Sequence, residues 1–162
     1  MLKRLTSSKN VVHEKYIQAA TNDAKEAVTS GDGQAYGAVM VRNGEIIGRG
    51  HSEVHKRRDP TAHAEIVLIQ SVCKYYNQPV LPEGCKLYLT AEPCPMCLTA
   101  CMWANVESIY YSASAKQCLE AEDGLGEQYK LQKDFITKIN DKEWKESYLK
   151  QILVEEANEV FR

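Results

Sequence analysis

Helical and strand-like patterns alternate along the central part of this sequence. Strands are predicted at residues 35–41, 45–49, 86–90 and 108–111. Helices are predicted at residues 10–30, 60–74 and 93–104. Asn43-Gly44 predicts a tight hairpin turn between the first two strands, and Asp59 and Pro60 predict an N-cap and first turn for the second helix. This alternation favours a three-layer α/β domain.

The composition agrees with a folded domain and excludes several other classes of protein. The 162 residues fit one domain, since domains usually hold about 100 to 200. Hydrophobic residues make up 44% and charged residues 26%, close to the average of soluble globular proteins, so neither disorder nor a fibrous repeat is indicated. The net charge of −2 lacks the basic excess of proteins that live on nucleic acid or anionic membranes, so neither partner is favoured.

No segment has the pattern of a membrane span or of a secretory signal. The densest apolar run is Ile66 to Ile69, whereas a spanning helix needs about 20 residues. Met1 to Asn10 carries basic residues but no apolar stretch after them. We therefore expect a cytoplasmic protein without a membrane partner.

The sequence after Ser112 has no clear strand pattern. Its apolar residues recur at helical spacing, and they are Trp144, Tyr148, Ile152, Leu153, Val160 and Phe161. A stripe of this kind must be buried. We therefore expect residues 113–162 to form a helical tail that packs on the body, residues 1–112, or on a partner subunit. The whole chain, 1–162, is expected to be a single domain.

Three residues of metal-binding type are predicted at helix starts. His63 falls in the first turn of the second helix, and Cys94 and Cys97 lie at the start of the third. The two cysteines are three residues apart, so they share a helix face, and the positive end of the helix favours their thiolate forms. One imidazole and two thiolates fill three positions of a tetrahedral zinc ion and leave the fourth for water, as in catalytic zinc sites.

Glu65 is the candidate partner of that water. Zinc lowers the pKa of bound water to near neutral, and a carboxylate can then move the proton between nucleophile and leaving group. Residues two apart on a helix point about 200° away from each other, so spacing alone does not place His63 and Glu65 in one pocket. The side chains of His63 and Glu65 both reach one metal ion only if the ion lies over the N-terminal end of the helix.

The remaining cysteines and histidines have simpler interpretations. A Cys-x-x-Cys pair by itself also occurs in redox proteins and in buried cores, although the flanking prolines and the His-x-Glu string favour a metal site here. Cys101 continues the face of the cysteine pair and is a possible spare ligand, but we expect burial for it and for Cys73, Cys85 and Cys118. His13 and His51 are not at ligand spacing.

Residues 55–58, His-Lys-Arg-Arg, form the only dense basic run. So close to the predicted site, this run can contact phosphates or an RNA backbone. A solvated loop is the favoured interpretation, because most short charge runs are exposed.

The string His63-Ala64-Glu65, followed by Pro93-Cys94-Pro95-Met96-Cys97, resembles the zinc deaminases of the cytidine and deoxycytidylate deaminase superfamily. The longer strings at 59–65 and 92–97 are similar to bacterial guanine deaminases and to tRNA adenosine deaminases. The resemblance covers roughly residues 34–111. A weaker similarity of the tail, from Phe135-Ile136 to Val160-Phe161, is closer to the guanine deaminases.

This resemblance implies a fold and a set of roles. The fold is a three-layer α/β/α, cytidine deaminase-like one, with a mixed central sheet of about five strands and a helical C-terminal tail. The ligands of Zn²⁺ would be His63, Cys94 and Cys97, and Glu65 would carry protons from the attacking water to a ring nitrogen and to the leaving ammonia. The backbone N–H of Ala64 would face the base, and a polar side chain before Asp59 would contact its edge.

Two positions bear on the substrate. Ser52 stands where relatives commonly carry an asparagine, and its single hydroxyl cannot make the same two-sided contact with a base. Guanine deaminases tend to place an acidic residue of the distal segment over the base, and Glu122 and Asp123 are the candidates here.

The leading hypothesis is a hydrolytic zinc deaminase that converts a free nucleobase, guanine before others, to its keto product and ammonia in purine metabolism. An alternative substrate is an adenosine of a tRNA anticodon, or cytosine or a nucleoside. A zinc-stabilised or redox module without turnover is the third hypothesis, and in it Glu65 has no chemical role. The resemblance also implies a homodimer, in which the tail can be exchanged between subunits.

Overall fold

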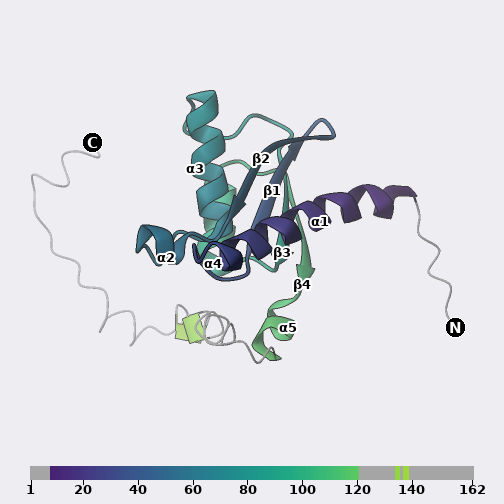
Figure 1. Cartoon of the computed structure of the whole chain (residues 1–162). Coiled ribbons are helices and arrows are strands. Elements are labelled where there is room, and N and C mark those ends of the chain that lie inside the picture. Colours follow the sequence, from purple (N-terminus) through teal and green to yellow (C-terminus); the bar gives the residue numbers. More distant parts are fainter. Residues whose placement is uncertain (1–7, 121–133, 136, 139–162) are drawn as a thin grey trace, which may run out of the picture.

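The computed structural model describes residues 8–120, 134–135 and 137–138 (Figure 1). Its elements are, in order, α1 (Ser8–Thr29), β1 (Gly37–Arg42), β2 (Glu45–His51), α2 (Val54–Arg57), α3 (Ala64–Tyr76), β3 (Lys86–Ala91), α4 (Pro95–Trp103), β4 (Ser108–Ala113) and α5 (Ala115–Glu120). Among the described helices, none is both long enough and apolar enough to cross a membrane.

The strands form one mixed sheet in the order β2-β1-β3-β4. β1 is antiparallel to both β2 and β3, whereas β3 and β4 are parallel. Asn43 and Gly44 connect β1 to β2, and both have positive φ values, 52° and 80°, as a primed hairpin turn requires. The described residues contain four strands of the expected five or so.

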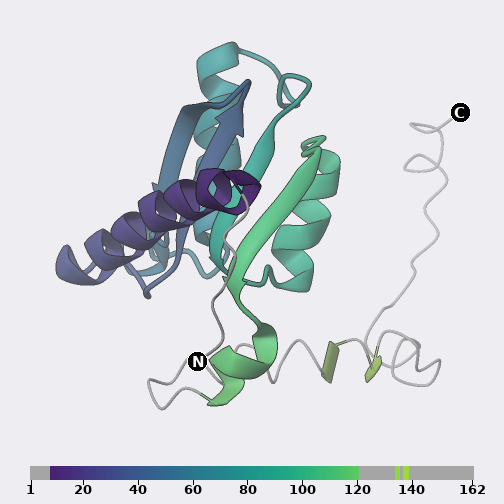
Figure 2. The same ribbon diagram turned by 90° about the vertical axis from the view of Figure 1, so that its right-hand side faces the viewer.

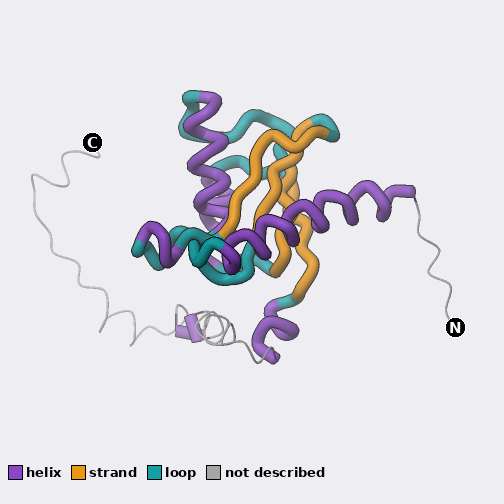
Figure 3. Tube along the Cα trace, in the orientation of Figure 1, coloured by secondary structure: helices purple, strands orange, loops and turns teal. Residues whose placement is uncertain are grey.

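Helices cover both faces of this sheet, so the domain has three layers. Alternate residues of β1 point to opposite faces. Ala38 and Met40 belong to the core cluster shared with α3 and α4, while Val39 and Val41 pack with Tyr16 and Ala20 of α1. Figure 2 shows α1 on one side of the strands and α3 and α4 on the other, and Figure 3 shows the strand layer between them. The three-layer α/β/α prediction is therefore confirmed.

The start of the second long helix differs from the prediction. α3 begins at Ala64 and not at Pro60, and its N-cap is His63. Asp59 instead closes a turn, because its Oδ1 accepts hydrogen bonds from the backbone N–H and the hydroxyl of Thr61 at 2.8 and 2.7 Å. An aspartate followed by a proline suits an Asx turn as well as a helix cap, so local sequence did not distinguish the two.

Two further boundaries were not predicted. The expected polar loop at 50–58 contains the end of β2 and the short helix α2. The third helix begins at Pro95, with Cys94 as its N-cap and not within its first turn.

The predicted tail lies mostly outside the described residues. β4 ends at Ala113 and α5 follows it directly. The apolar stripe from Trp144 to Phe161 is outside the described residues, as are the two acidic candidates Glu122 and Asp123. The division into a body and a packed tail stays a prediction.

Candidate active site and metal centre

The N-caps of α3 and α4 carry two of the three predicted ligands. His63 has an extended backbone, with φ −66° and ψ 158°, and its carbonyl accepts the first helical hydrogen bond, from Val67 at 3.0 Å. Cys94 has nearly the same backbone angles, −68° and 163°. Pro95 follows it at a position where a missing N–H is tolerated. Both side chains therefore project from helix ends.

Cys97 lies one turn into α4 and faces Cys94. The Cys94 thiol acts as the cap acceptor, because the backbone N–H of Cys97 donates to its Sγ at 3.4 Å. This is the arrangement expected for an anionic group at the positive end of a helix. The capping contact also explains why Cys94 and Cys97 converge on one point.

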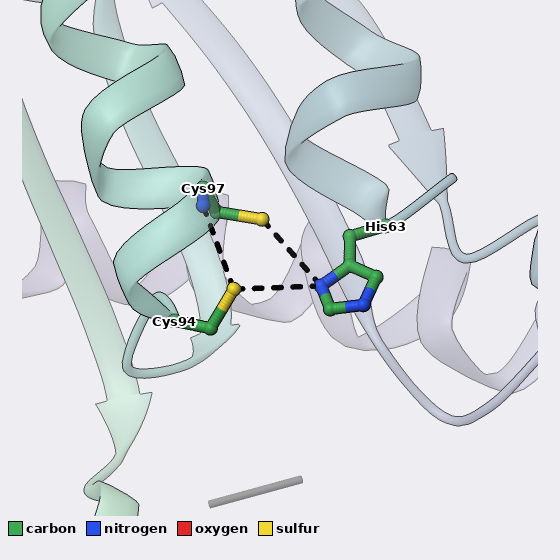
Figure 4. Close-up of side chains that lie close together, drawn as sticks. All are labelled: His63, Cys94 and Cys97. Carbon is green, nitrogen blue, oxygen red and sulfur yellow. Dashed lines mark hydrogen bonds between the residues drawn. The ribbon is translucent and has the colours of Figure 1, made fainter. Parts of the chain in front are cut away.

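The structure brings the three predicted ligands together (Figure 4). His63 Nδ1 lies 3.7 Å from Cys94 Sγ and 3.5 Å from Cys97 Sγ, and one ligand atom of each residue falls within 4.8 Å of the others. In a tetrahedral site with Zn–S near 2.3 Å and Zn–N near 2.05 Å, nitrogen and sulfur ligands are separated by about 3.6 Å. The donor set and its spacing therefore fit zinc.

The charges in this cluster favour a thiolate. The hydrogen bonds from Cys97 and then from His63 together lower the pKa of the Cys94 thiol to about 4. The pKa of Cys97 is raised, because its thiol donates to Cys94 and is buried. The same contact with Cys94 raises the pKa of His63. A thiolate is the form that binds metals.

Glu65 reaches the same cluster from the first turn of α3. Its side chain is buried, and burial raises the pKa of its carboxyl above the ordinary value. The carboxyl and the Cys97 thiol influence each other's pKa, and the charge of His63 lowers the pKa of the carboxyl. The angle of about 200° between helical residues two apart does not separate His63 from Glu65. His63 is an N-cap with extended backbone angles, and the helical rotation per residue begins only after it.

The two proposed base-contacting residues in the described part of the chain, Ala64 and Ser52, are both buried. Ala64, the first residue of α3, is 1% exposed. Ser52 directly follows β2 and is also 1% exposed, and its hydroxyl has no hydrogen-bond partner. The N–H of the next residue, Glu53, donates to the carbonyl of Ala62 at 2.9 Å, which ties this segment to the start of α3.

The remaining cysteines are not part of the cluster. Cys85, Cys101 and Cys118 are buried and Cys73 is half-buried, and all are free thiols. Cys101 packs in the core between α4 and the sheet, where burial raises its pKa to about 12. Its location agrees with the expectation of burial.

The basic run at 55–58 is largely neutralised by carboxylates of the chain itself. Lys56 Nζ lies 3.1 Å from Asp32 Oδ2 and 3.4 Å from Glu53 Oε1, and Arg57 forms an ion pair with Glu53. Asp32 lies in the sequence between two helix-ending glycines, Gly31 and Gly33, and neither Asp32 nor His51 was predicted to have a role. Their contacts join segments about 20 residues apart, so no local pattern pointed to them.

This fold and this site define the chain as a zinc-binding deaminase of the cytidine deaminase family. Residues 10–113 match the family model described as the cytidine and deoxycytidylate deaminase zinc-binding region, and the chain belongs to that family. The fold is the cytidine deaminase-like one expected from the sequence.

Individual relatives act on different substrates. The chain is 41% identical to guanine deaminase of Bacillus subtilis (strain 168) over 109 residues, which are 67% of this chain and 69% of the relative. It is 40% identical to tRNA-specific adenosine deaminase of Aquifex aeolicus (strain VF5) over 104 residues, or 64% of this chain and 68% of the relative.

Solved structures of both kinds are also similar. The crystal structure of guanine deaminase from Bacillus subtilis superposes with a TM-score of 0.79 and 34% identity, covering 92% of this chain and 90% of that one. A structure from studies of A-to-I editing by tRNA:A34 deaminases has a TM-score of 0.58 and 37% identity, covering 62% of this chain and 72% of that one.

Proposed function

We propose that the protein is a hydrolytic deaminase of a free nucleobase and that its substrate is guanine, which it converts to xanthine and ammonia. The observation that carries the proposal is the convergence of His63, Cys94 and Cys97 on one point with the buried carboxyl of Glu65 beside them. Three ligands and an adjacent acid are what hydrolytic removal of an amine requires, since water must be activated and a proton delivered.

Each residue has a specific part in this proposal. His63, through Nδ1, and the thiolates of Cys94 and Cys97 hold the zinc ion. When bound, zinc lowers the pKa of a water ligand toward neutral and so makes water nucleophilic at the pH of the cell. Glu65 accepts a proton from the attacking water and gives it to a ring nitrogen, while the water oxygen bonds to the ring carbon that bears the amine. Glu65 then takes the remaining proton of that oxygen and passes it to the exocyclic amine, so that the C–N bond breaks, ammonia leaves and the keto product remains.

The raised pKa of Glu65 suits this work. A group that both takes up and releases a proton is most effective when its pKa lies near the operating pH, and burial moves the pKa of a carboxyl in that direction. The N–H of Ala64 and the hydroxyl of Ser52 orient the base. Glu122 and Asp123, outside the described residues, remain candidates for an acidic contact over it.

Two observations favour guanine over a tRNA adenosine. Similarity to the guanine deaminase structure extends over 92% of this chain, compared with 62% for the tRNA:A34 deaminase structure. The basic run next to the site is paired with Asp32 and Glu53, so two of its cations are engaged and less available to RNA phosphates. We accordingly place the protein in the cytoplasm, in purine metabolism.

The substrate assignment is tested with zinc-loaded protein and a panel of guanine, adenine, cytosine, their nucleosides, and a tRNA carrying adenosine in its anticodon. Ultraviolet absorbance and released ammonia report turnover of the small molecules, and inosine content reports the tRNA. We expect turnover of guanine. Activity on the tRNA with none on guanine would show that a tRNA adenosine, and not guanine, is the substrate. No activity on any member of the panel would overturn the proposed function.

We also propose a homodimer, with the tail packing on its own body or on the partner. The exposed apolar residues Met102 and Trp103 at the C-terminal end of α4, 75% and 81% exposed, support contact with a second subunit. Molar mass in solution measured by light scattering tests it, and a monomer at micromolar concentration would contradict it.

A further inference from the structure

Asp32 connects the turn after α1 to the segment that follows β2. Its Oδ2 accepts hydrogen bonds from His51 Nε2 at 2.8 Å and from Lys56 Nζ at 3.1 Å. Its backbone carbonyl accepts two more, from the N–H groups of His55 and Lys56 at 2.9 and 3.0 Å. One residue thus holds both sides of a short segment, residues 51–56, which we call the 51–56 segment.

The turn that carries Asp32 is itself anchored. The N–H groups of Asp32 and Gly33 both donate to the carbonyl of Ala27 in α1, at 2.9 and 3.2 Å. Gly33 lies directly against Ser52, because a Cβ at this position would come within 2.4 Å of the Ser52 carbonyl oxygen and 2.5 Å of its Oγ. The turn therefore clamps Ser52 by packing as well as through the hydrogen bonds on either side.

The side chain held in this way is a buried hydroxyl without a partner. Ser52 is 1% exposed, and its Oγ makes no hydrogen bond in the structure. Its own N–H donates to the carbonyl of Tyr36 at 3.0 Å, so its backbone is fixed as well. Buried hydroxyl groups are nearly always paired, so an unpaired one is unusual. The segment that carries it is joined to the start of α3, because the N–H of Glu53 donates to the carbonyl of Ala62 at 2.9 Å.

We propose that Asp32 is a positioning residue that holds the Ser52 hydroxyl where it contacts the base. The inference rests on the proposed function, and within it Asp32 acts only through Ser52 and touches neither substrate nor metal. A hydroxyl is short and offers one donor, so it binds a base edge only if the backbone that carries it is held in place.

The charges around Asp32 support a clamp and not a second metal site. Asp32, His51 and Glu53 have ligand atoms within 4.8 Å of one another. The ammonium of Lys56, however, bridges the two carboxylates at 3.1 and 3.4 Å and supplies the positive charge that a metal would bring. The pKa of Asp32 is lowered by the hydrogen bonds from His51 and then Lys56, so the carboxylate is ionised and accepts from both.

A double-mutant cycle in steady-state kinetics tests the proposal. We expect Asp32→Ala to raise KM for the base about 5- to 10-fold and to change kcat less than about 2-fold, since one hydrogen bond to substrate is weakened. Ser52→Ala should raise KM about 10-fold. The double variant should lie within about 2-fold of Ser52→Ala, because Asp32 has nothing left to position. If the KM increases of the two single variants multiply in the double variant, the proposal is overturned.

Two variants control for stability and for conservative replacement. Asp23→Asn removes another carboxylate of the α1 region, one that pairs with Arg49 of β2 at 2.8 Å but has no contact with the 51–56 segment. It should lower the melting temperature while KM stays unchanged. Asp32→Asn keeps one acceptor oxygen and should fall between wild type and Asp32→Ala. An equal rise of KM in Asp23→Asn would reduce Asp32 to a structural role and overturn the proposal.

Amide hydrogen exchange separates this proposal from the proposed function. The amides of residues 52–56 should exchange about 10-fold faster in Asp32→Ala than in wild type and in Asp23→Asn. If no base is turned over but exchange rises in this way, the proposed function fails while the clamp stands. Unchanged exchange would overturn the clamp whatever the activity.

Discussion

Glu65 shows at the scale of one residue how function and stability oppose each other. Its carboxyl is buried at the start of α3 beside the Cys97 thiol, and burial raises its pKa. The raised pKa suits a proton carrier. In the ionised form, however, the same burial costs free energy, because a charge is removed from water.

Glu65→Gln is expected to abolish most activity without changing the fold. The amide keeps the size of the side chain but cannot carry a proton, so kcat should fall about 10²- to 10⁴-fold. Zinc content, measured by elemental analysis, and the circular dichroism spectrum should match those of wild type. Glu107→Gln, at an exposed carboxylate paired with Lys86, is the control and should keep full activity. Unchanged turnover in Glu65→Gln would rule out its role.

The same substitution should stabilise the metal-chelated protein in a manner that depends on pH. Because the pKa of Glu65 is raised in the folded state, the carboxyl contributes most to stability below its unfolded pKa of about 4.3 and loses that contribution as pH rises through the folded pKa. Glu65→Gln, neutral throughout, should therefore be more stable than wild type at pH 7 and equal to it near pH 4. Urea unfolding at both pH values measures this, and the opposite trend would contradict it.

At the scale of elements, α3 and α4 bring the ligands together by the way they pack. Both helices belong to the core cluster that includes Met40 and Leu87 of the sheet, and each presents a ligand at its N-cap. The distance between the two N-caps is thus set by side chains several residues further along, such as Leu68 in α3.

Leu68→Ala is expected to lower the free energy of unfolding by about 2–5 kcal/mol, because Leu68 is fully buried and its truncation leaves a cavity. Leu98→Ala, the same change on the outer face of α4 where the side chain is 45% exposed, should cost less than about 1 kcal/mol. Urea unfolding of both variants gives the comparison. Equal costs would mean that α3 is not packed on the sheet as described.

For the whole molecule, the metal is expected to join two separate parts of the chain. His63 and the cysteine pair are 31 residues apart along the sequence and come from different helices. An ion bound to both stabilises only the folded state, in which the two N-caps meet.

Removal of zinc by a chelator should therefore lower the melting temperature by roughly 10 °C, which corresponds to a few kcal/mol for a domain of this size. Differential scanning calorimetry with and without chelator measures the shift. Cys94→Ala should begin at the lower temperature and respond little to chelator. A wild-type melting temperature that does not change on chelation would contradict a shared site.

Much of the fold was predictable because it follows from local chemistry. Apolar spacing indicated α1 and the four strands, and Asn43-Gly44 indicated the turn between β1 and β2. Local chemistry was less decisive where one signal permits two structures. Asp59 and Pro60 predicted a helix start and instead close a turn, while α2 went unnoticed because a helix of one turn leaves no apolar stripe.

The donor set of the metal site could be predicted from the residues alone, since imidazole, thiol and carboxyl groups and the cysteine spacing are properties of the chain. Three features required the packed structure: His63 and Glu65 face one cluster, carboxylates of the chain pair with Lys56 and Arg57 of the basic run, and Asp32 holds the segment around Ser52. The physical reason is distance along the chain: periodicity reports contacts within a few residues, whereas these contacts exist only after the sheet and its helices have packed.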